Sequence, residues 1–180
     1  MPQPTLETDR LRLRPFTVDD APLVRELAGA REVAATTLNV PHPYEEGMAE
    51  AWIATHAPAY AADEMATFAI TLAGPGELVG SIGLRIVRSH ARAELGYWIG
   101  VPHWGRGYAT EAARAVIAFG FEELGLNRIY AQHMASNPAS GRVMQKAGMR
   151  HEGTLRQHVT KFGVRDDIAI YGILASDRPD

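Results

Sequence analysis

The stretch WIGVPHWGRGYATEA, residues 98–112, decides the fold of this chain. It predicts the end of a strand, a short glycine-rich turn and the start of a helix. Gly105 and Gly107 permit positive φ and let a ligand approach the backbone. The first N–H groups of a helix have no partner inside it, and the helix dipole places partial positive charge there. An anion such as a pyrophosphate fits this end, and Arg106 adds a full positive charge beside it.

The glycine turn alone does not name its ligand. A dinucleotide fingerprint needs a third glycine, where this chain has Thr110, and a Walker loop needs G-x-x-x-x-G-K-[ST], which is absent. A tight left-handed turn that simply enters a helix explains the same residues without any ligand. The helix expected from Tyr108 to Leu124 has the clearest apolar stripe in the chain, with Gly125 as its C-terminal cap. This context favours an anion site.

The rest of the chain is read as strands and helices from its hydrophobic periodicity. Strands are expected at 11–14, 67–72, 78–87, 93–100, 127–134, 149–160 and 165–174, and further helices at 17–29, 45–60 and 137–148. The turn at 73–76 predicts a hairpin between the second and third of these strands. We therefore expect a mixed-sheet α/β or α+β sandwich that forms a single domain over residues 1–180.

Composition excludes several classes of protein. The chain has no cysteine, so disulfides, thiolate metal sites and a cysteine nucleophile are excluded. Its net charge is −3, from 18 basic and 21 acidic residues, without the basic run that nucleic acid demands. No stretch approaches ~18 consecutive apolar residues, and the polar start has no signal-type segment. We expect a cytoplasmic protein with no nucleic-acid or membrane partner.

The histidines and the early acidic residues give weaker signals. No histidines have the spacing of a metal site, so no metal is expected, and His103, His133, His151 and His158 are interpreted as scattered surface or strand residues. Acidic side chains gather at Glu45, Glu46, Glu50, Asp63 and Glu64. This cluster either attracts a cationic amine or forms a solvated helix face.

Several segments together resemble one family. These are the opening LETDRLRLR (6–14), the run ELGYWI (94–99), the run WGRGYATEA (104–112), and a later segment from Asn137-Pro138-Ala139-Ser140 to Lys146-Ala147-Gly148-Met149. In this order they resemble the GNAT N-acetyltransferase superfamily, and more narrowly its RimJ/RimL-like branch of ribosomal-protein N-terminal acetyltransferases. The superfamily pattern is Q/R-x-x-G-x-G/A; here Trp104 departs from its first position, while Gly107 and Ala109 match.

The resemblance implies a fold, a reaction and a set of site residues. The fold is a mostly antiparallel sheet of about six or seven strands flanked by about four helices. The reaction is transfer of an acetyl group from acetyl-CoA to a primary amine, on a protein N-terminus or a small molecule. A homodimer is compatible with this fold. The implied cofactor-binding residues are Ile99, Gly100, Val101, Trp104, Gly105, Arg106, Gly107, Tyr108, Ala109, Thr110, Asn137 and Ser140.

The implied chemistry is direct attack of a neutral amine on the thioester. An amine with a pKa of about 8 to 10 is mostly charged at neutral pH, so a carboxylate base is useful. Glu94 is the candidate base, because it lies on the strand that leads into the phosphate turn, and an exposed strand-end glutamate is the alternative. Backbone N–H groups near Ile99 to Val101 are the candidate oxyanion donors. Ser140 is the candidate acid, or else an ordinary serine at a helix start.

Other readings of the same residues stay open. Asn137 suits a helix N-cap as well as a contact with the pantetheine arm, and Gly148 suits the helix end. Tyr44 resembles a substrate-pocket residue of the branch, although packing between helices also explains it. The whole chain is alternatively an inactive coenzyme A-binding module, or a nucleotide-binding domain that uses the same helix end.

Overall fold

The computed structural model describes residues 2–177; Met1 and residues 178–180, which the predicted domain range includes, lie outside them. The strands are β1 (Leu6–Glu7), β2 (Leu11–Arg14), β3 (Met65–Leu72), β4 (Leu78–Val87), β5 (Arg92–Ile99), β6 (Arg128–Met134), β7 (Arg150–Lys161) and β8 (Val164–Leu174). The α-helices are α1 (Ala21–Gly29), α2 (Arg31–Thr36), α3 (Met48–Ala54), α4 (His56–Ala61), α5 (Tyr108–Glu122) and α6 (Pro138–Lys146). Short 3-10 turns cover Val18–Asp20, Arg88–His90, Val101–His103 and Ala175–Asp177.

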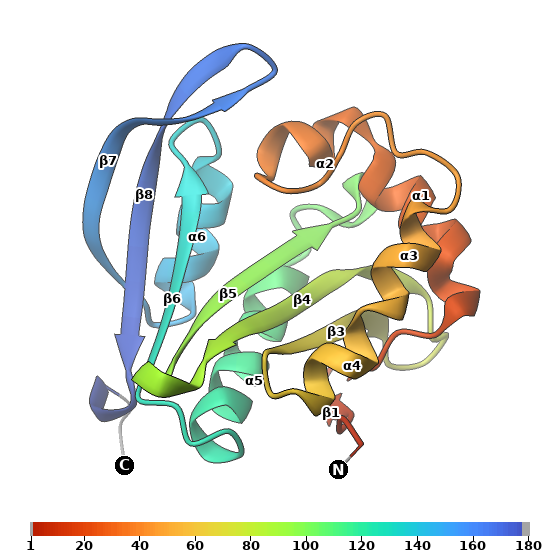
Figure 1. Ribbon diagram of the computed structural model, residues 1–180, viewed down its shortest axis with the longest axis horizontal. Helices are drawn as coiled ribbons and strands as arrows, with labels where there is room; N and C mark the ends of the chain where they lie inside the picture. The colour runs from red at the N-terminus through yellow and green to blue at the C-terminus, as the bar shows by residue number, and fades with distance from the viewer. Residues whose placement is uncertain (1, 178–180) are drawn as a thin grey trace.

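All these strands form one sheet, in the order β1-β2-β3-β4-β5-β6-β8-β7 (Figure 1). The pairings are antiparallel except that between β5 and β6, which is parallel. The predicted mixed, mostly antiparallel sheet is therefore confirmed. Within residues 2–177 it has eight strands rather than six or seven, because β1 adds a two-residue edge strand that periodicity does not detect.

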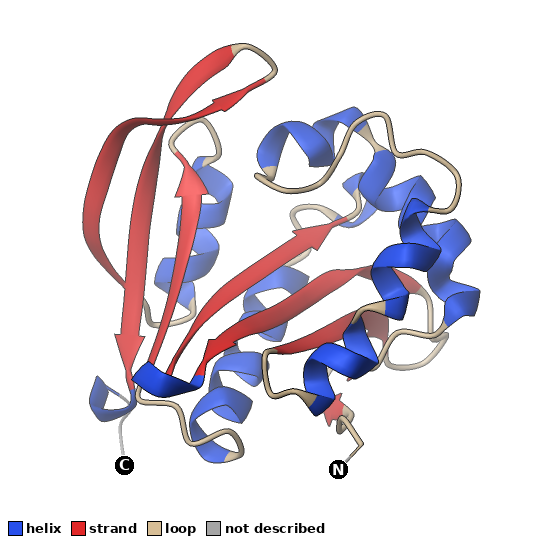
Figure 2. Ribbon diagram, in the orientation of Figure 1, coloured by secondary structure: helices blue, strands red, loops and turns tan. Residues whose placement is uncertain are grey.

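Helices cover both faces of the sheet (Figures 1 and 2). Helices α5 and α6 lie behind the sheet in the view of Figure 1, and α1 to α4 lie in front of it. The larger core joins the sheet to α5, and in it Phe68 and Phe119 pack edge to face with their ring centroids 5.5 Å apart. A second core joins α1 and α3 to the front of the sheet through Val24, Ile53 and Trp98.

The hairpin predicted from the turn at 73–76 is confirmed, since Phe68 pairs with Ile82 in an antiparallel register. The helix predicted over 45–60 is instead two helices, α3 and α4, which meet at Thr55. The Thr55 hydroxyl donates to the Trp52 carbonyl at 2.7 Å, and this side-chain bond competes with a continuous helix. The six-residue α2 was not predicted, because it is too short to show a helical period. No helix among the described residues is long and apolar enough to cross a membrane.

Candidate active site

A cleft of about 890 Å³ opens where β5 and β6 part. The two strands pair only at Arg92 with Arg128, Ala93 with Ile129, and Glu94 with Tyr130. Beyond Glu94 they diverge, as Figure 1 shows, and no strand within residues 2–177 pairs with β5 on that side. The cleft therefore reaches through the middle of the sheet, from α5 and α6 on one face to α1 and α3 on the other.

The turn before α5 presents unpaired backbone donors to this cleft. Gly105 and Gly107 have φ of 74° and 82°, as their predicted left-handed conformation requires. The first helical hydrogen bond of α5 runs from the Glu111 N–H to the Gly107 carbonyl, at 3.1 Å. Within residues 2–177, no backbone N–H from Gly105 to Thr110 has an acceptor. These donors and the helix dipole form a site for an anion.

A network from the start of the chain holds this turn in place. The Glu111 carboxylate accepts hydrogen bonds from the Thr8 hydroxyl at 2.7 Å, the Arg10 N–H at 3.0 Å and Arg10 Nε at 2.7 Å. Arg10 Nη1 donates to the Arg106 carbonyl at 3.0 Å. Burial alone would raise the pKa of Glu111, but the hydrogen bonds from Thr8 and Arg10 outweigh it and lower the pKa. The network fixes the Arg106 peptide that separates the two glycines.

Trp104 also positions the turn. Its indole Nε1 donates to the Ile99 carbonyl at 2.6 Å, so the side chain ties the turn back to the end of β5. Ile99, Trp104 and the residues from Tyr108 to Thr110 line the cleft. The tryptophan at this variable position of the superfamily pattern thus has a structural role in this chain.

Three residues expected at the cofactor do not line the cleft. Gly100 packs against α1, where an added Cβ would lie 2.7 Å from Leu27 Cδ2, so its glycine serves close packing. Val101 packs in the second core, beside α1 and α3. The Arg106 side chain is exposed outside the cleft, and its carbonyl is the group that faces Arg10.

The structure places the candidate oxyanion donors two residues earlier in the chain than the sequence predicts, at Tyr97 and Ile99. The Gly100 N–H donates to the Val79 carbonyl at 2.9 Å and is not free, which corrects its assignment as a donor. Because N–H groups alternate along an antiparallel pair, those of Tyr97 and Ile99 then point away from β4, toward β6. Pairing with β6 has already ended at Glu94, so both face the cleft without a strand partner. Sequence reasoning included Ile99 but missed Tyr97.

The start of α6 brings Asn137 and Ser140 to the opposite side of the cleft. Asn137 is the N-cap, as expected: its side-chain oxygen accepts from the Ser140 N–H at 3.4 Å, and its amide donates to the Thr36 carbonyl at 3.2 Å. The Tyr97 hydroxyl lies 2.7 Å from Ser140 Oγ. Burial raises the pKa of Tyr97 to about 12, although the bond to Ser140 lowers it, so the phenol keeps its proton at neutral pH.

Glu94 lies at the point where the strands part, and it lines the cleft. Its Oε1 accepts from Gln132 Nε2 at 2.9 Å, and its Oε2 lies 3.4 Å from the Tyr130 hydroxyl. The side chain is half-buried rather than an exposed strand end. A carboxylate held by β6 at the cleft is placed to act as a base.

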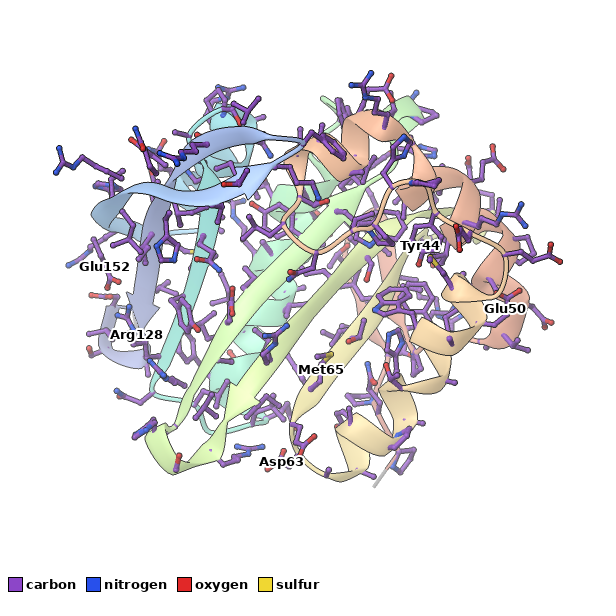
Figure 3. All side chains as sticks on the ribbon, turned by 45° about the horizontal axis from the view of Figure 1, so that its top comes forward. Tyr44, Glu50, Asp63, Met65, Arg128 and Glu152 are labelled. Carbon is purple, nitrogen blue, oxygen red and sulfur yellow. The ribbon has the colours of Figure 1, made fainter. Side chains whose placement is uncertain are left out.

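The front of the cleft is bounded by helices and by the loop before α3. Tyr44 lines the cleft, and burial, together with the charge of Glu50, raises its pKa. None of the five acidic residues of the early cluster lines the cleft, and Asp63 is instead paired with Arg88. In Figure 3, Met65 lies on the open face of the sheet, while Glu50 lies at the outer edge of the helical layer. All five residues are exposed, but only Glu50 lies in a helix, so the cluster neither lines the cleft nor forms one helix face.

Other charged and titratable groups in the cleft were missed from the sequence. Arg142 and Lys146, on successive turns of α6, line it and have no acidic partner among the described residues. His103 was interpreted as a surface or strand residue, yet it is buried and lines the cleft, with Nδ1 unbonded. His133 lies on β6 as expected and also lines the cleft. Residues 2–177 hold no group of three or more His, Asp or Glu that could bind a metal ion.

Comparison with known proteins agrees with this architecture. Residues 10–150 match the acetyltransferase (GNAT) domain model. The chain is 36% identical over 172 residues to the uncharacterized N-acetyltransferase YoaA of Bacillus subtilis (strain 168), covering 95% of this chain and 97% of that protein. It is 32% identical over 96 residues to the ribosomal-protein-serine acetyltransferase of Escherichia coli (strain K12), covering 53% and 54%. The crystal structure of a GNAT-family acetyltransferase from Bacillus anthracis superposes with a TM-score of 0.84 at 28% identity, covering 95% and 98%.

The chain shares its fold with the Bacillus anthracis protein, and in this chain the sheet parts between two parallel strands with a helix N-terminus at the opening. The chain belongs to the GNAT acetyltransferase family, and it is an N-acetyltransferase.

Proposed function

We propose that this protein transfers the acetyl group of acetyl-CoA to a primary amine by direct attack, with Glu94 as the base. One observation carries the proposal: a single cleft joins the anion site before α5 to the Glu94 carboxylate, through the gap between β5 and β6. An acetyl donor and an acceptor amine can therefore meet inside the sheet without a covalent enzyme intermediate.

The described residues fit coenzyme A. The unpaired N–H groups from Gly105 to Thr110 suit its diphosphate, and Arg142 and Lys146 add positive charge on the facing helix. Asn137 and Ser140 border the gap that an extended pantetheine arm would occupy. When bound, acetyl-CoA supplies the activated acetyl thioester.

The remaining steps belong to residues of this chain. Glu94 takes the proton of the ammonium group and leaves a neutral amine. The N–H groups of Tyr97 and Ile99 stabilise negative charge on the attacked carbonyl oxygen. As the C–N bond forms and the C–S bond breaks, the Ser140 hydroxyl, bonded to the protonated Tyr97 hydroxyl, can relay to the leaving sulfur the proton that the attacking nitrogen gives up. A thiol with a pKa of about 8.5 is a fair leaving group unaided, so this last role contributes least.

The test combines binding and turnover. Calorimetric titration is expected to show one-to-one binding of acetyl-CoA that ATP and NAD do not displace. Thiol release with a panel of amines then measures transfer, and Glu94→Gln is expected to lower kcat about 100-fold or more without weakening acetyl-CoA binding. The control Glu123→Gln removes an exposed carboxylate after α5 and leaves both unchanged. Full turnover by Glu94→Gln would remove Glu94 as the base, and binding without any turnover would favour the inactive module.

Four further features of the working enzyme are part of this proposal. We propose one catalytic domain, a cytoplasmic location and a homodimer, with no nucleic-acid partner. The E. coli relative is named for a ribosomal protein, so a protein N-terminus is a candidate acceptor beside small amines. Sedimentation equilibrium tests the dimer, and a monomer at micromolar concentration would contradict it.

A further inference from the structure

We infer that the acceptor is a primary amine with an anionic group a few bonds from its nitrogen, and that Arg85 binds the anion while Glu94 receives the amine. This inference rests on the proposed function, because it names the substrate class of the same cleft. It starts from two charged residues that the sheet places side by side on the front of the cleft.

The register of the sheet aligns these residues. Met65 on β3 is opposite Arg85 on β4, Arg85 is opposite Glu94 on β5, and Glu94 is opposite Tyr130 on β6. Residues directly opposite on neighbouring strands project from the same face, with Cβ atoms about 5 Å apart. Arg85 and Glu94 both line the cleft. They form one row of side chains beneath the space that an acceptor would enter.

The two charges in this row are not paired with each other. The Glu94 carboxylate is held on its other side by Gln132 and Tyr130, which belong to β6. Within residues 2–177, the exposed Arg85 guanidinium makes no hydrogen bond or ion pair, unlike Arg14 with Asp20 or Arg128 with Glu152. An unpaired guanidinium beside a carboxylate suits a ligand that carries both an anionic group for Arg85 and an amine for Glu94.

The next row of the sheet leaves room for such a ligand. Gly83 and Gly96 are opposite each other, and both line the cleft. A Cβ at Gly96 would meet no atom within 4 Å, so the space above it is open. At Gly83 a Cβ would lie 2.7 Å from the Ala66 carbonyl oxygen, so glycine is required there. An acceptor can lie on this bare backbone with its amine near Glu94 and its anion near Arg85.

No other charged residue that lines the cleft is placed to bind the anionic group of the acceptor beside Glu94. Arg142 and Lys146 lie on α6, behind the sheet with the anion site of α5. None of the acidic residues near α3 lines the cleft, so Glu94 is its one carboxylate among the described residues. A polyamine would bring a second positive charge toward Arg85. The charges therefore favour an acidic amine over a polycation.

The experiment compares acceptors that differ only in the anion. One arm uses peptide amides that begin with Asp or with Asn; the other uses β-alanine and its amide, and rates are expressed per neutral amine. We expect wild type to favour each acid by at least about tenfold in kcat/KM, since a charge-assisted hydrogen bond is lost with the neutral member. The arm with the larger preference identifies a peptide or a small molecule as the source of the anion.

Variants of Arg85 test whether that residue provides the preference. Arg85→Gln is expected to reduce the preference to about twofold by slowing only the acids, and Arg85→Lys to restore part of it. Calorimetric binding of each acceptor in the presence of coenzyme A measures the same preference without turnover. Equal binding and equal rates for acid and amide, a faster rate with spermidine, or an equal loss for both members in Arg85→Gln would overturn the inference. Anion-selective binding without turnover would instead overturn the proposed function and leave Arg85 as the anion partner.

Discussion

The cleft has two walls that are built differently. The cofactor wall, which comprises Trp104, Gly105, residues 107–110, Asn137 and Ser140, presents mainly backbone N–H groups from the turn before α5. The acceptor wall, which comprises Met65, Thr67, Gly83, Arg85, Glu94 and Gly96, presents side chains and bare backbone from three strands. A wall made of backbone depends on φ and on helix position, whereas a wall made of side chains depends on their charge and volume. Substitutions in the cofactor wall should therefore change acetyl-CoA binding, and substitutions of volume or charge in the acceptor wall should change how the acceptor is used.

The largest effect on acetyl-CoA binding is expected from distortion of the cofactor wall. Gly107→Val places a β-branched residue at a φ of 82°, directly before α5. Relief of that strain rotates the donors, and we expect the Kd of acetyl-CoA to rise roughly 5- to 30-fold, since the left-handed region costs an L-residue about 1–2 kcal/mol. Calorimetry measures the change.

A glycine outside the cleft provides the control. Gly76 has a φ of 72° in the turn between β3 and β4, and a Cβ there meets no atom within 4 Å. Gly76→Val is expected to lower the free energy of unfolding by the same strain of about 1–2 kcal/mol, while the Kd of acetyl-CoA stays unchanged. An unchanged Kd in Gly107→Val would show that the N–H groups of this turn do not bind the cofactor.

The acceptor wall should respond to volume instead. Gly96→Val fills the open space beside Glu94, and we expect the KM of the acceptor to rise about tenfold, because added volume in a fitted site costs on the order of 1–3 kcal/mol. The Kd of acetyl-CoA should stay within twofold. Steady-state kinetics measures the KM of the acceptor, and calorimetry measures the Kd of acetyl-CoA. Gly153→Val on β7, where a Cβ also meets no atom within 4 Å outside the cleft, should change neither constant.

A smaller effect is expected behind the cofactor wall. Arg10→Gln removes the bond to the Arg106 carbonyl and weakens the hold on Glu111. Because Arg10 is half exposed, we expect the Kd of acetyl-CoA to rise only about two- to fivefold, with kcat unchanged. Arg12→Gln breaks the exposed pair between Arg12 on β2 and Glu7 on β1, and it should leave the Kd unchanged. Equal effects of the two variants would contradict a positioning role for Arg10.

The smallest expected effect is on the free energy of unfolding, and it comes from Asp20 at the start of α1, in front of the sheet. Burial alone would raise the pKa of Asp20, but hydrogen bonds from Arg14 and Thr17 outweigh it and lower the pKa. A lowered folded-state pKa means that ionised Asp20 stabilises the protein above its ordinary pKa of about 3.9. We expect wild type to exceed Asp20→Asn in unfolding free energy by about 0.5 kcal/mol at pH 7.

That advantage should disappear as the pH falls below about 4, through the lowered pKa of Asp20. Urea unfolding of both proteins between pH 3 and pH 7 measures it. The exposed control Asp19→Asn should show a smaller difference at every pH. A difference for Asp20→Asn that persists at pH 3 would assign the stabilisation to shape and not to charge.

The sequence predicted the backbone of the turn before α5 and the start of α6 well, because the information for both is local. The positive φ of Gly105 and Gly107, the helix from Tyr108 and the N-cap at Asn137 all follow from short patterns. The same argument explains the errors. Gly100 resembles a cradle glycine within its turn, yet its need for glycine comes from Leu27 on another element.

The acceptor wall could not be predicted in the same way. Arg85, Gly83 and Gly96 acquire meaning only when β4 and β5 are paired in register, and a shift of one residue would turn each to the other face. Glu94 was found because it precedes the turn, but its partners Gln132 and Tyr130 lie on a strand reached after α5. His103 was misplaced because burial of a turn residue depends on what covers it.

The gap between β5 and β6 also has a consequence for hydrogen exchange. Strand β5 is in the interior of the sheet order, so its amides should be among the most protected. Those of Trp98 and Gly100 point to β4 and should exchange slowly, while those of Tyr97 and Ile99 face the cleft and should exchange as if they belonged to an edge strand. One interior strand thus carries alternating fast and slow amides. Occupation of the cleft would make its protection continuous, a direct signal of cofactor binding that needs no turnover.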